Sequence, residues 1–170
     1  MSKSMLYFAY LSNMSPKRML QSCPSATVKS IAKLEDHKLV FIGNKDEWAG
    51  ACGNAVKSKG DLLWGVVWEV SESDMPALQE TEKGGNIDFN VPLCKVVTPE
   101  GEELECLFFY RQSSEADIGL PSRQYVKVGI QGAIRNKLPQ SYVDMLRSVE
   151  TNNNSKMTEG MEKALYPDED

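Results

Sequence analysis

The sequence has few of the residues on which most hydrolytic and metal-dependent active sites are built. Its 170 residues include a single histidine, His37, and four cysteines, none of which forms a CxxC pair with another. This spacing offers no zinc site, and we expect no bound metal. A Ser-His or Cys-His nucleophile would have to use His37, which lies in a charged stretch and is expected at the surface. Acid–base chemistry is therefore expected to rest on a carboxylate.

Basic charge and long apolar runs are also missing. The net charge is −5, which argues against the basic surface of a nucleic-acid-binding protein. No run of 18 apolar residues is present, and residues 1–10 lack the apolar core of a signal peptide. We therefore expect no nucleic-acid partner, no membrane association and a cytoplasmic location, in which the four cysteines stay reduced and pack as small apolar residues.

The apolar pattern places strands early in the chain and helices late. Strands are predicted over 5–10, 38–42, 50–56, 62–70, 93–98 and 104–111, the last two joined by a hairpin turn at 99–102. Helices are predicted over 17–22, 74–82, 122–136, 139–149 and 156–165. Ser15-Pro16 marks the start of the first, and Ser73-Asp74 and Gly84-Gly85 mark the two ends of the second. The third carries an apolar stripe of Tyr125, Val128, Gly129 and Ala133. This order is typical of an α+β protein, with a twisted mixed or barrel-like β-sheet flanked by helices. We expect one domain over 1–150 and a polar, acidic tail over 151–170 with a short helix.

One carboxylate is distinguished by its place in the helix predicted over 74–82. At about 100° per residue, Met75 and Leu78 define an apolar side, Glu82 falls on that side, and Glu80 falls on the opposite one. Burial disfavours the charged form of a carboxyl group, so the pKa of Glu82 should rise toward the range of a general acid or base. The alternative is that Glu82 sits in the last turn and bends into water.

A second candidate element joins the first predicted strand to the first predicted helix. Residues 7–14 read YFAYLSNM, an apolar strand that ends in the polar loop Leu11-Ser12-Asn13. Backbone N–H groups of such a loop, with those that begin the next helix, suit an anionic ligand group. An ordinary capped turn explains the same pattern. Tyr125, which follows a loop containing Pro121-Ser122, either donates to a ligand or packs in the core.

Taken together, these segments resemble the γ-glutamylcyclotransferase family. YFAYLSNM is similar to the family signature, which is normally Tyr-Gly-Ser-Asn followed by Leu or Met. The resemblance extends over about residues 5–150. It also rests on Trp48, Gly50, Gly60-Asp61, the segment 64–68 (WGVVW), Glu82, Glu100-Gly101, the segment 122–125 (SRQY), Gly132-Ala133 and Leu138-Pro139. Motifs in the same order over such a length indicate a shared fold.

The resemblance implies an enzyme that converts γ-glutamyl dipeptides to 5-oxoproline and a free amino acid. The α-amino nitrogen of the substrate attacks its own γ-carbonyl carbon, so the protein provides no nucleophile and needs no cofactor. The match gives Glu82 the role of proton relay. It implies substrate binding by Tyr7, Tyr10, Leu11, Ser12, Asn13 and Tyr125. The expected partner is a small γ-glutamyl peptide, and the family includes many homodimers.

The sequence departs from the family pattern around this site. Leu11 stands where the family has glycine; a left-handed backbone there would cost leucine on the order of 1 kcal/mol, or its side chain would fill the glutamyl pocket. Lys83, Phe89, Cys52 and Asn54 also differ from the usual family residues. Three hypotheses follow: an active γ-glutamylcyclotransferase, a related enzyme acting on glutathione or a γ-glutamyl amine, and a non-catalytic paralogue that binds a small molecule or a protein.

Overall fold

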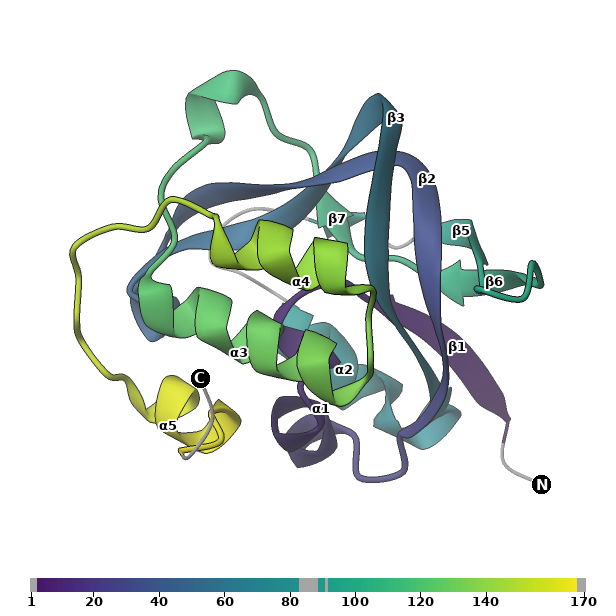
Figure 1. Cartoon of the computed structure of the whole chain (residues 1–170). Coiled ribbons are helices and arrows are strands. Elements are labelled where there is room, and N and C mark those ends of the chain that lie inside the picture. Colours follow the sequence, from purple (N-terminus) through teal and green to yellow (C-terminus); the bar gives the residue numbers. More distant parts are fainter. Residues whose placement is uncertain (1–2, 83–88, 91, 168–170) are drawn as a thin grey trace.

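Five strands close into a barrel, and helices cover one side of it in the computed structural model (Figure 1). The structure describes residues 3–82, 89–90 and 92–167. The strands are β1 (Ser4–Ala9), β2 (Thr27–Lys45), β3 (Gly50–Ser71), β4 (Phe89–Asn90), β5 (Leu93–Val97), β6 (Glu103–Leu107) and β7 (Tyr110–Arg111). The α-helices are α1 (Pro16–Ser22), α2 (Met75–Glu82), α3 (Arg123–Arg135), α4 (Gln140–Arg147) and α5 (Glu159–Ala164). None of the helices in these ranges is long and apolar enough to cross a membrane.

The barrel confirms the predicted fold class. Its strand order is β1-β3-β2-β5-β6, and it closes where β1 pairs in parallel with β6 at Tyr7 and Leu107. The other pairs are antiparallel, and the hairpin turn predicted at 99–102 joins β5 to β6. Tyr7, Phe8 and Ala9 at the end of β1 are buried in the core. The end of β1 is therefore anchored in the barrel, and the chain leaves it into the loop that the sequence singled out.

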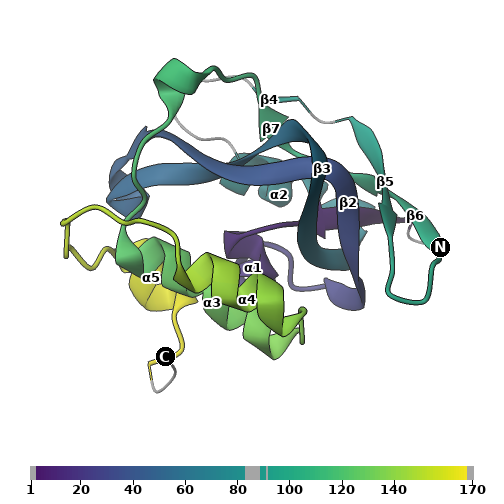
Figure 2. The ribbon, with the colours of Figure 1, turned by 45° about the horizontal axis from the view of Figure 1, so that its top comes forward.

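Two long strands replace several short ones, which is the main error in the predicted strands. β2 and β3 pair over almost their whole length and run as one long, bent ribbon (Figures 1 and 2). The register shifts at three places along this pair, including the one between Glu35 and His37. Asp36 there has φ 58°, and its carboxylate accepts a hydrogen bond of 2.8 Å from the N–H of Gly60 in β3. Polar residues in this arm are extended because they pair with each other, and a search for apolar runs misses such strands.

The strand predicted over 104–111 is divided in two. β6 ends at Leu107, while Tyr110 and Arg111 form β7 and pair with β4 in a separate sheet. Between them, the consecutive residues Phe108 and Phe109 are both buried, which an ordinary strand with one buried face does not allow. The break lets Arg111 pair with β4 and reach the end of α2, where its Nη2 donates to the Glu82 carbonyl oxygen.

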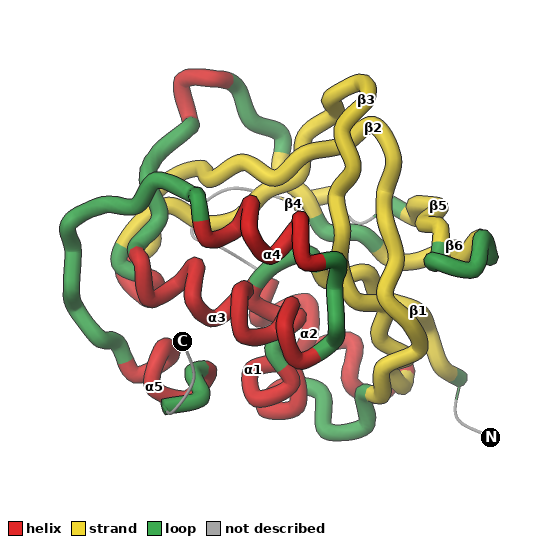
Figure 3. Tube along the Cα trace, in the orientation of Figure 1, coloured by secondary structure: helices red, strands yellow, loops and turns green. Residues whose placement is uncertain are grey.

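The helices gather on one side of the barrel, as the colouring of Figure 3 shows. The predicted stripe on α3 is confirmed, since Tyr125, Val128, Gly129 and Ala133 are all buried. The predicted caps of α2 are wrong in part: the 3₁₀ turn Glu72–Asp74 precedes this helix, and the Asp74 carboxylate accepts from Ser25 instead. The Gly84-Gly85 end predicted for α2 lies outside the described residues.

The C-terminal segment is attached to the rest of the molecule. The Asn152 side chain, in the predicted polar tail, donates to the carbonyl oxygen of Ala49 at 2.9 Å. The helix α5 forms within the predicted range 156–165, and its Met161 and Ala164 side chains are fully buried. The side-chain amide of Gln131 in α3 donates to the Tyr166 carbonyl oxygen and accepts from the Tyr166 N–H. The segment therefore covers part of the helical side.

Ser122 links the helical side to the barrel and provides a test of the fold. Its buried hydroxyl donates to the carbonyl oxygen of Trp48 at 2.7 Å and accepts from the N–H of Tyr125 at 3.2 Å, capping α3. Ser122→Ala removes the cap and leaves the Trp48 carbonyl without its donor. We expect the free energy of unfolding, measured with urea, to fall by about 2–3 kcal/mol. The exposed cap Ser114 is the control, and equal losses for Ser122→Ala and Ser114→Ala would contradict this account.

Candidate active site

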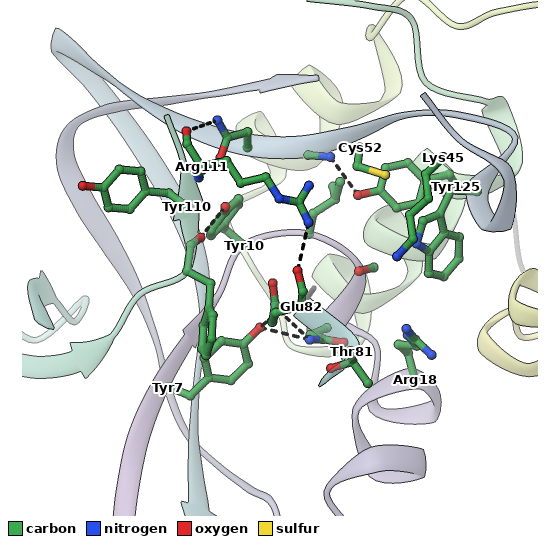
Figure 4. Close-up of a pocket in the computed structure, with 17 residues that line it drawn as sticks. Tyr7, Tyr10, Arg18, Lys45, Cys52, Thr81, Glu82, Tyr110, Arg111 and Tyr125 are labelled. Atoms are coloured by element: carbon green, nitrogen blue, oxygen red, sulfur yellow. Dashed lines mark hydrogen bonds between the residues drawn. The ribbon is translucent and has the colours of Figure 1, made fainter. Parts of the chain in front are cut away.

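A cavity opens where the end of β1, the turn after it and the end of α2 meet. Its lining includes all seven residues that the sequence predicted as site residues: Tyr7, Tyr10, Leu11, Ser12, Asn13, Glu82 and Tyr125. Figure 4 shows Tyr7, Tyr10 and Tyr125 on different walls with Glu82 between them. Residues 75 positions apart in the chain therefore meet in one place.

Glu82 turns its carboxyl group toward β1 rather than into bulk water. Its Oε1 atom accepts hydrogen bonds from the Tyr7 hydroxyl at 2.5 Å and from Asn13 Nδ2 at 2.8 Å. Asn13 Nδ2 also lies 3.0 Å from the Tyr7 hydroxyl oxygen, so the three side chains form a closed cluster. On the same helix Leu78 is fully buried and Glu80 is exposed, as the helical spacing predicted.

The surroundings of Glu82 act on its pKa in opposite directions. Burial raises the pKa of this carboxyl above its usual value, while the hydrogen bonds from Tyr7 and Asn13 and the charges of Arg111 and Arg18 lower it. Burial and the neighbouring Glu82 raise the pKa of Tyr7, so its hydroxyl stays protonated and donates. A desolvated carboxyl group with such partners is able to accept and release a proton.

The turn that carries Asn13 is held from three sides. Trp68 Nε1 of β3 donates to the Asn13 carbonyl oxygen at 2.9 Å. Ser15 caps α1 by accepting from the N–H of Arg18, and Pro16 begins that helix, as predicted. A Cβ atom added to Gly132 of α3 would lie 2.5 Å from the Ser15 nitrogen, so this glycine lets the turn lie directly on the helix. The N–H groups of Ser12 and Asn13 precede the first hydrogen bond of the turn, from Met14 to Leu11.

The two remaining tyrosines differ in what they leave for a ligand. Tyr10 donates its hydroxyl hydrogen to the Phe109 carbonyl oxygen at 2.7 Å. The Tyr125 hydroxyl instead accepts from the N–H of Gly53 at 2.8 Å, which leaves its own hydrogen available. Its ring packs against Trp48, with centroids 4.9 Å apart. Tyr125 therefore serves both of the alternatives that the sequence left open, since it packs in the core and presents a donor to the cavity.

Leu11 does not adopt the left-handed backbone that was considered for it. Its φ is −151°, so the cost of a left-handed leucine does not arise. The side chain is only 4% exposed and lies between β3 and α3. A Cβ atom added to Gly53 or to Gly129 would come within 2.6 Å of a Leu11 methyl carbon. Glycines on both sides therefore make room for a leucine where the family has glycine, and the leucine forms part of the cavity wall.

The sequence did not single out three basic residues in the cavity lining, Arg18, Lys45 and Arg111. One of these residues, Arg111, is bound by Asn54, which the sequence analysis noted only as a departure from the family pattern. The Asn54 side chain accepts from the Arg111 N–H and donates to the Arg111 carbonyl oxygen, both at 2.9 Å. Asn54 thus holds β7 against β3 as a strand partner would.

The remaining residues named in the sequence analysis make no hydrogen bond to Glu82 among those described. His37, expected at the surface, is half-buried against Phe108 and does not line the cavity. Cys52 lines the cavity, and burial raises the pKa of its thiol to about 11, so it is uncharged at neutral pH. Lys83 lies outside the described residues, and Phe89 belongs to β4. Within the described ranges, no three His, Cys, Asp or Glu residues gather as ligands for a metal ion.

Comparisons with known proteins identify relatives of this chain. Residues 62–146 match the model of the AIG2-like family. The chain is 36% identical over 169 residues to the γ-glutamylcyclotransferase of Mus musculus and 34% identical over 168 residues to that of Homo sapiens. Each alignment covers 96% of this chain and 88% of the relative.

The chain belongs to the γ-glutamylcyclotransferase family. A solved structure of a γ-glutamyl cyclotransferase superposes on it with a TM-score of 0.88 at 34% identity, covering 94% of this chain and 96% of that one. The family fold, which the sequence predicted from its motifs, is therefore established for this chain. The residues in the cavity, including the leucine at position 11, are then those of a family member with a modified signature loop.

The packing of Leu11 is tested by removing it. Leu11→Gly deletes a buried side chain between two glycines that cannot fill the space, so we expect the free energy of unfolding to fall by about 2–5 kcal/mol. The loss should be smaller in the double variant Leu11→Gly/Gly129→Ala, because the new methyl group occupies part of the gap and alanine favours the helix. Urea titration of the four proteins of this cycle measures the coupling.

The matched control is Gly129→Ala alone. Its methyl group would overlap the Leu11 side chain, so this single change should destabilise the protein despite the better helix propensity of alanine. Additive effects of the two changes would show that Leu11 and Gly129 do not depend on each other.

Proposed function

We propose that this protein converts γ-glutamyl dipeptides to 5-oxoproline and a free amino acid. The observation that carries the proposal is the Glu82 carboxyl group, desolvated and bonded to Tyr7 and Asn13 in a cavity bordered by the signature loop. Membership of the γ-glutamylcyclotransferase family supports the same reaction. A cytoplasmic location, a single domain over 1–150 and a homodimer remain predictions.

In the proposed reaction Glu82 moves one proton. The carboxylate takes it from the α-amino group of the substrate, whose nitrogen then attacks the γ-carbonyl carbon and closes a five-membered ring. The carbon–nitrogen bond to the leaving amino acid breaks as Glu82 returns the proton to that nitrogen. The products are 5-oxoproline and the amino acid, and no water is consumed. Since the nucleophile is tethered to its target, much of the rate comes from effective molarity.

The other cavity groups have supporting roles in this proposal. The N–H groups of Ser12 and Asn13 offer donors to the carbonyl oxygen that gains negative charge during ring closure. The Tyr125 hydroxyl hydrogen is a further donor toward the substrate. Tyr7 and Asn13 hold the Glu82 carboxyl in one orientation, so the proton is accepted and returned along fixed directions.

The direct test incubates the purified protein with γ-glutamyl-alanine and quantifies 5-oxoproline. Formation of 5-oxoproline supports the proposal. The non-catalytic hypothesis, which rested on Leu11, predicts instead that γ-glutamyl-alanine raises the melting temperature but gives no product. Glutathione and a γ-glutamyl amine, assayed in parallel, test the related enzyme activities.

Glu82→Gln should separate catalysis from stability. We expect kcat to fall by about 10²–10⁴, because the amide cannot relay a proton. Since burial raises the pKa of Glu82 in the folded state, the folded protein binds more protons than the unfolded chain just above pH 4.5, and stability falls as pH rises through that window. The variant should therefore melt at or above the wild-type temperature at pH 7 and lose this advantage at acid pH. A variant with full turnover would refute the role of Glu82.

Tyr7→Phe tests the hydrogen bond to Glu82. Removing a donor from the carboxylate raises its pKa further, so the low-pH limb of the kcat/KM profile should move to higher pH by about 1–2 units. The phenylalanine ring keeps the edge contact with Phe109, which limits the structural change. Tyr10→Phe is the matched control, since that hydroxyl donates to a backbone oxygen and its loss should leave the limb in place.

A further inference from the structure

The cavity is basic although the whole protein is acidic. Arg18, Lys45 and Arg111 line it together with Glu82, in a chain whose net charge is −5. Two of these cations form ion pairs with Glu47. Its Oε1 lies 3.6 Å from Arg18 Nη2, and its Oε2 lies 3.1 Å from Lys45 Nζ. Among the residues that the structure describes, no carboxylate forms an ion pair with Arg111. Arg111 is therefore the lining cation that has no carboxylate partner among these residues.

Arg111 is held firmly in the cavity. Its backbone is fixed by the two hydrogen bonds to the Asn54 side chain. Its Nη2 donates to the Glu82 carbonyl oxygen at 2.9 Å, and Figure 4 shows its guanidinium extended into the cavity between Glu82 and Tyr125. Its Nε, like that of Arg18 in the same cavity, is buried without a hydrogen-bond partner in the described part of the chain. Buried donors without an acceptor are rare in folded proteins, and a water, an ion or a bound ligand explains many of them.

The substrate class supplies such an acceptor. A γ-glutamyl amino acid carries two carboxylates, one on the carbon that bears the attacking nitrogen and one on the carbon that bears the leaving nitrogen. Both nitrogens have to reach the Glu82 carboxyl group during the proposed reaction. Each carboxylate is then brought close to Glu82, and Arg111 lies beside Glu82.

We propose that Arg111 binds one carboxylate of the substrate and makes the site selective for γ-glutamyl amino acids that carry it. This inference rests on the proposed function and names its substrate class. The planar guanidinium presents donors in a fork that matches a carboxylate, and such pairs are among the strongest hydrogen bonds in proteins. The hydrogen bond from Arg111 to the Glu82 backbone couples the anchor to the proton relay, so a bound carboxylate is positioned relative to the reacting atoms.

Three substrates test the proposal and identify the carboxylate. γ-Glutamyl-alanine has both groups, γ-glutamyl-ethylamine lacks the carboxylate of the leaving group, and 4-aminobutanoyl-alanine lacks that of the glutamyl group while still cyclising, to 2-pyrrolidinone. For the wild type, loss of the anchored carboxylate should lower kcat/KM by about 10- to 100-fold. Arg111→Gln keeps a donor for the Glu82 carbonyl. In this variant, the substrate that lacks the anchored carboxylate should have nearly the same kcat/KM as γ-glutamyl-alanine. Arg111→Lys, which keeps the charge, should retain part of the difference in kcat/KM between these two substrates.

Lys45→Gln is the matched control, because it removes an equal charge from the same cavity but from a side chain already paired with Glu47. It should leave the preference of the wild type in place. The proposal is overturned if Arg111→Gln discriminates against both probes as strongly as the wild type, or if Lys45→Gln relaxes the preference equally. If the wild type forms no product from γ-glutamyl-alanine, the proposed function itself fails. A wild type that cyclises all three substrates equally well refutes the Arg111 anchor alone.

Discussion

The arrangement of the site depends on keeping one carboxyl group out of water. Burial of Glu82 is costly for its charged form, and among the described residues two neutral donors, Tyr7 and Asn13, offset that cost by hydrogen bonds. Both come from a single stretch of chain, the end of β1 and the turn that follows. Their positions in turn depend on closure of the barrel, which buries Tyr7, and on Trp68, which binds the Asn13 backbone. The orientation of the Glu82 carboxyl group on α2 is therefore set by residues on the opposite side of the cavity.

Close packing of the signature turn against α3 explains how a large residue is tolerated at position 11. Glycine inside a helix or strand costs roughly 0.5–1 kcal/mol relative to alanine, so its presence in α3 and β3 calls for a packing reason. Gly129 and Gly53 provide the volume that Leu11 fills, and Gly132 lets the next residues of the turn approach the helix backbone. The leucine is thus part of a set of matched positions, and its backbone needs no left-handed conformation.

Charge is distributed so that the cavity differs from the surface around it. The carboxylate of Glu47 pairs with Arg18 and Lys45, while Arg111, beside Glu82, has no carboxylate partner in the part of the chain that the structure describes. Arg111 and Arg18 lower the pKa of Glu82 and so counteract part of the effect of burial. An anionic ligand group bound at Arg111 would weaken that effect, which ties substrate binding to the proton affinity of the relay.

The sequence by itself determined the features that depend on local spacing. Helical periodicity put Glu82 beside Leu78, Ser15-Pro16 and Ser122 marked helix starts, and the signature motif indicated the family. Only the tertiary structure decided the paired polar arms of β2 and β3, the backbone of Leu11 and the place of Arg111. Each of these depends on a partner distant in the chain: a facing strand, two glycines, and the end of a helix 29 residues away. Local pattern indicates which side of an element is buried, but long-range packing determines which groups meet there.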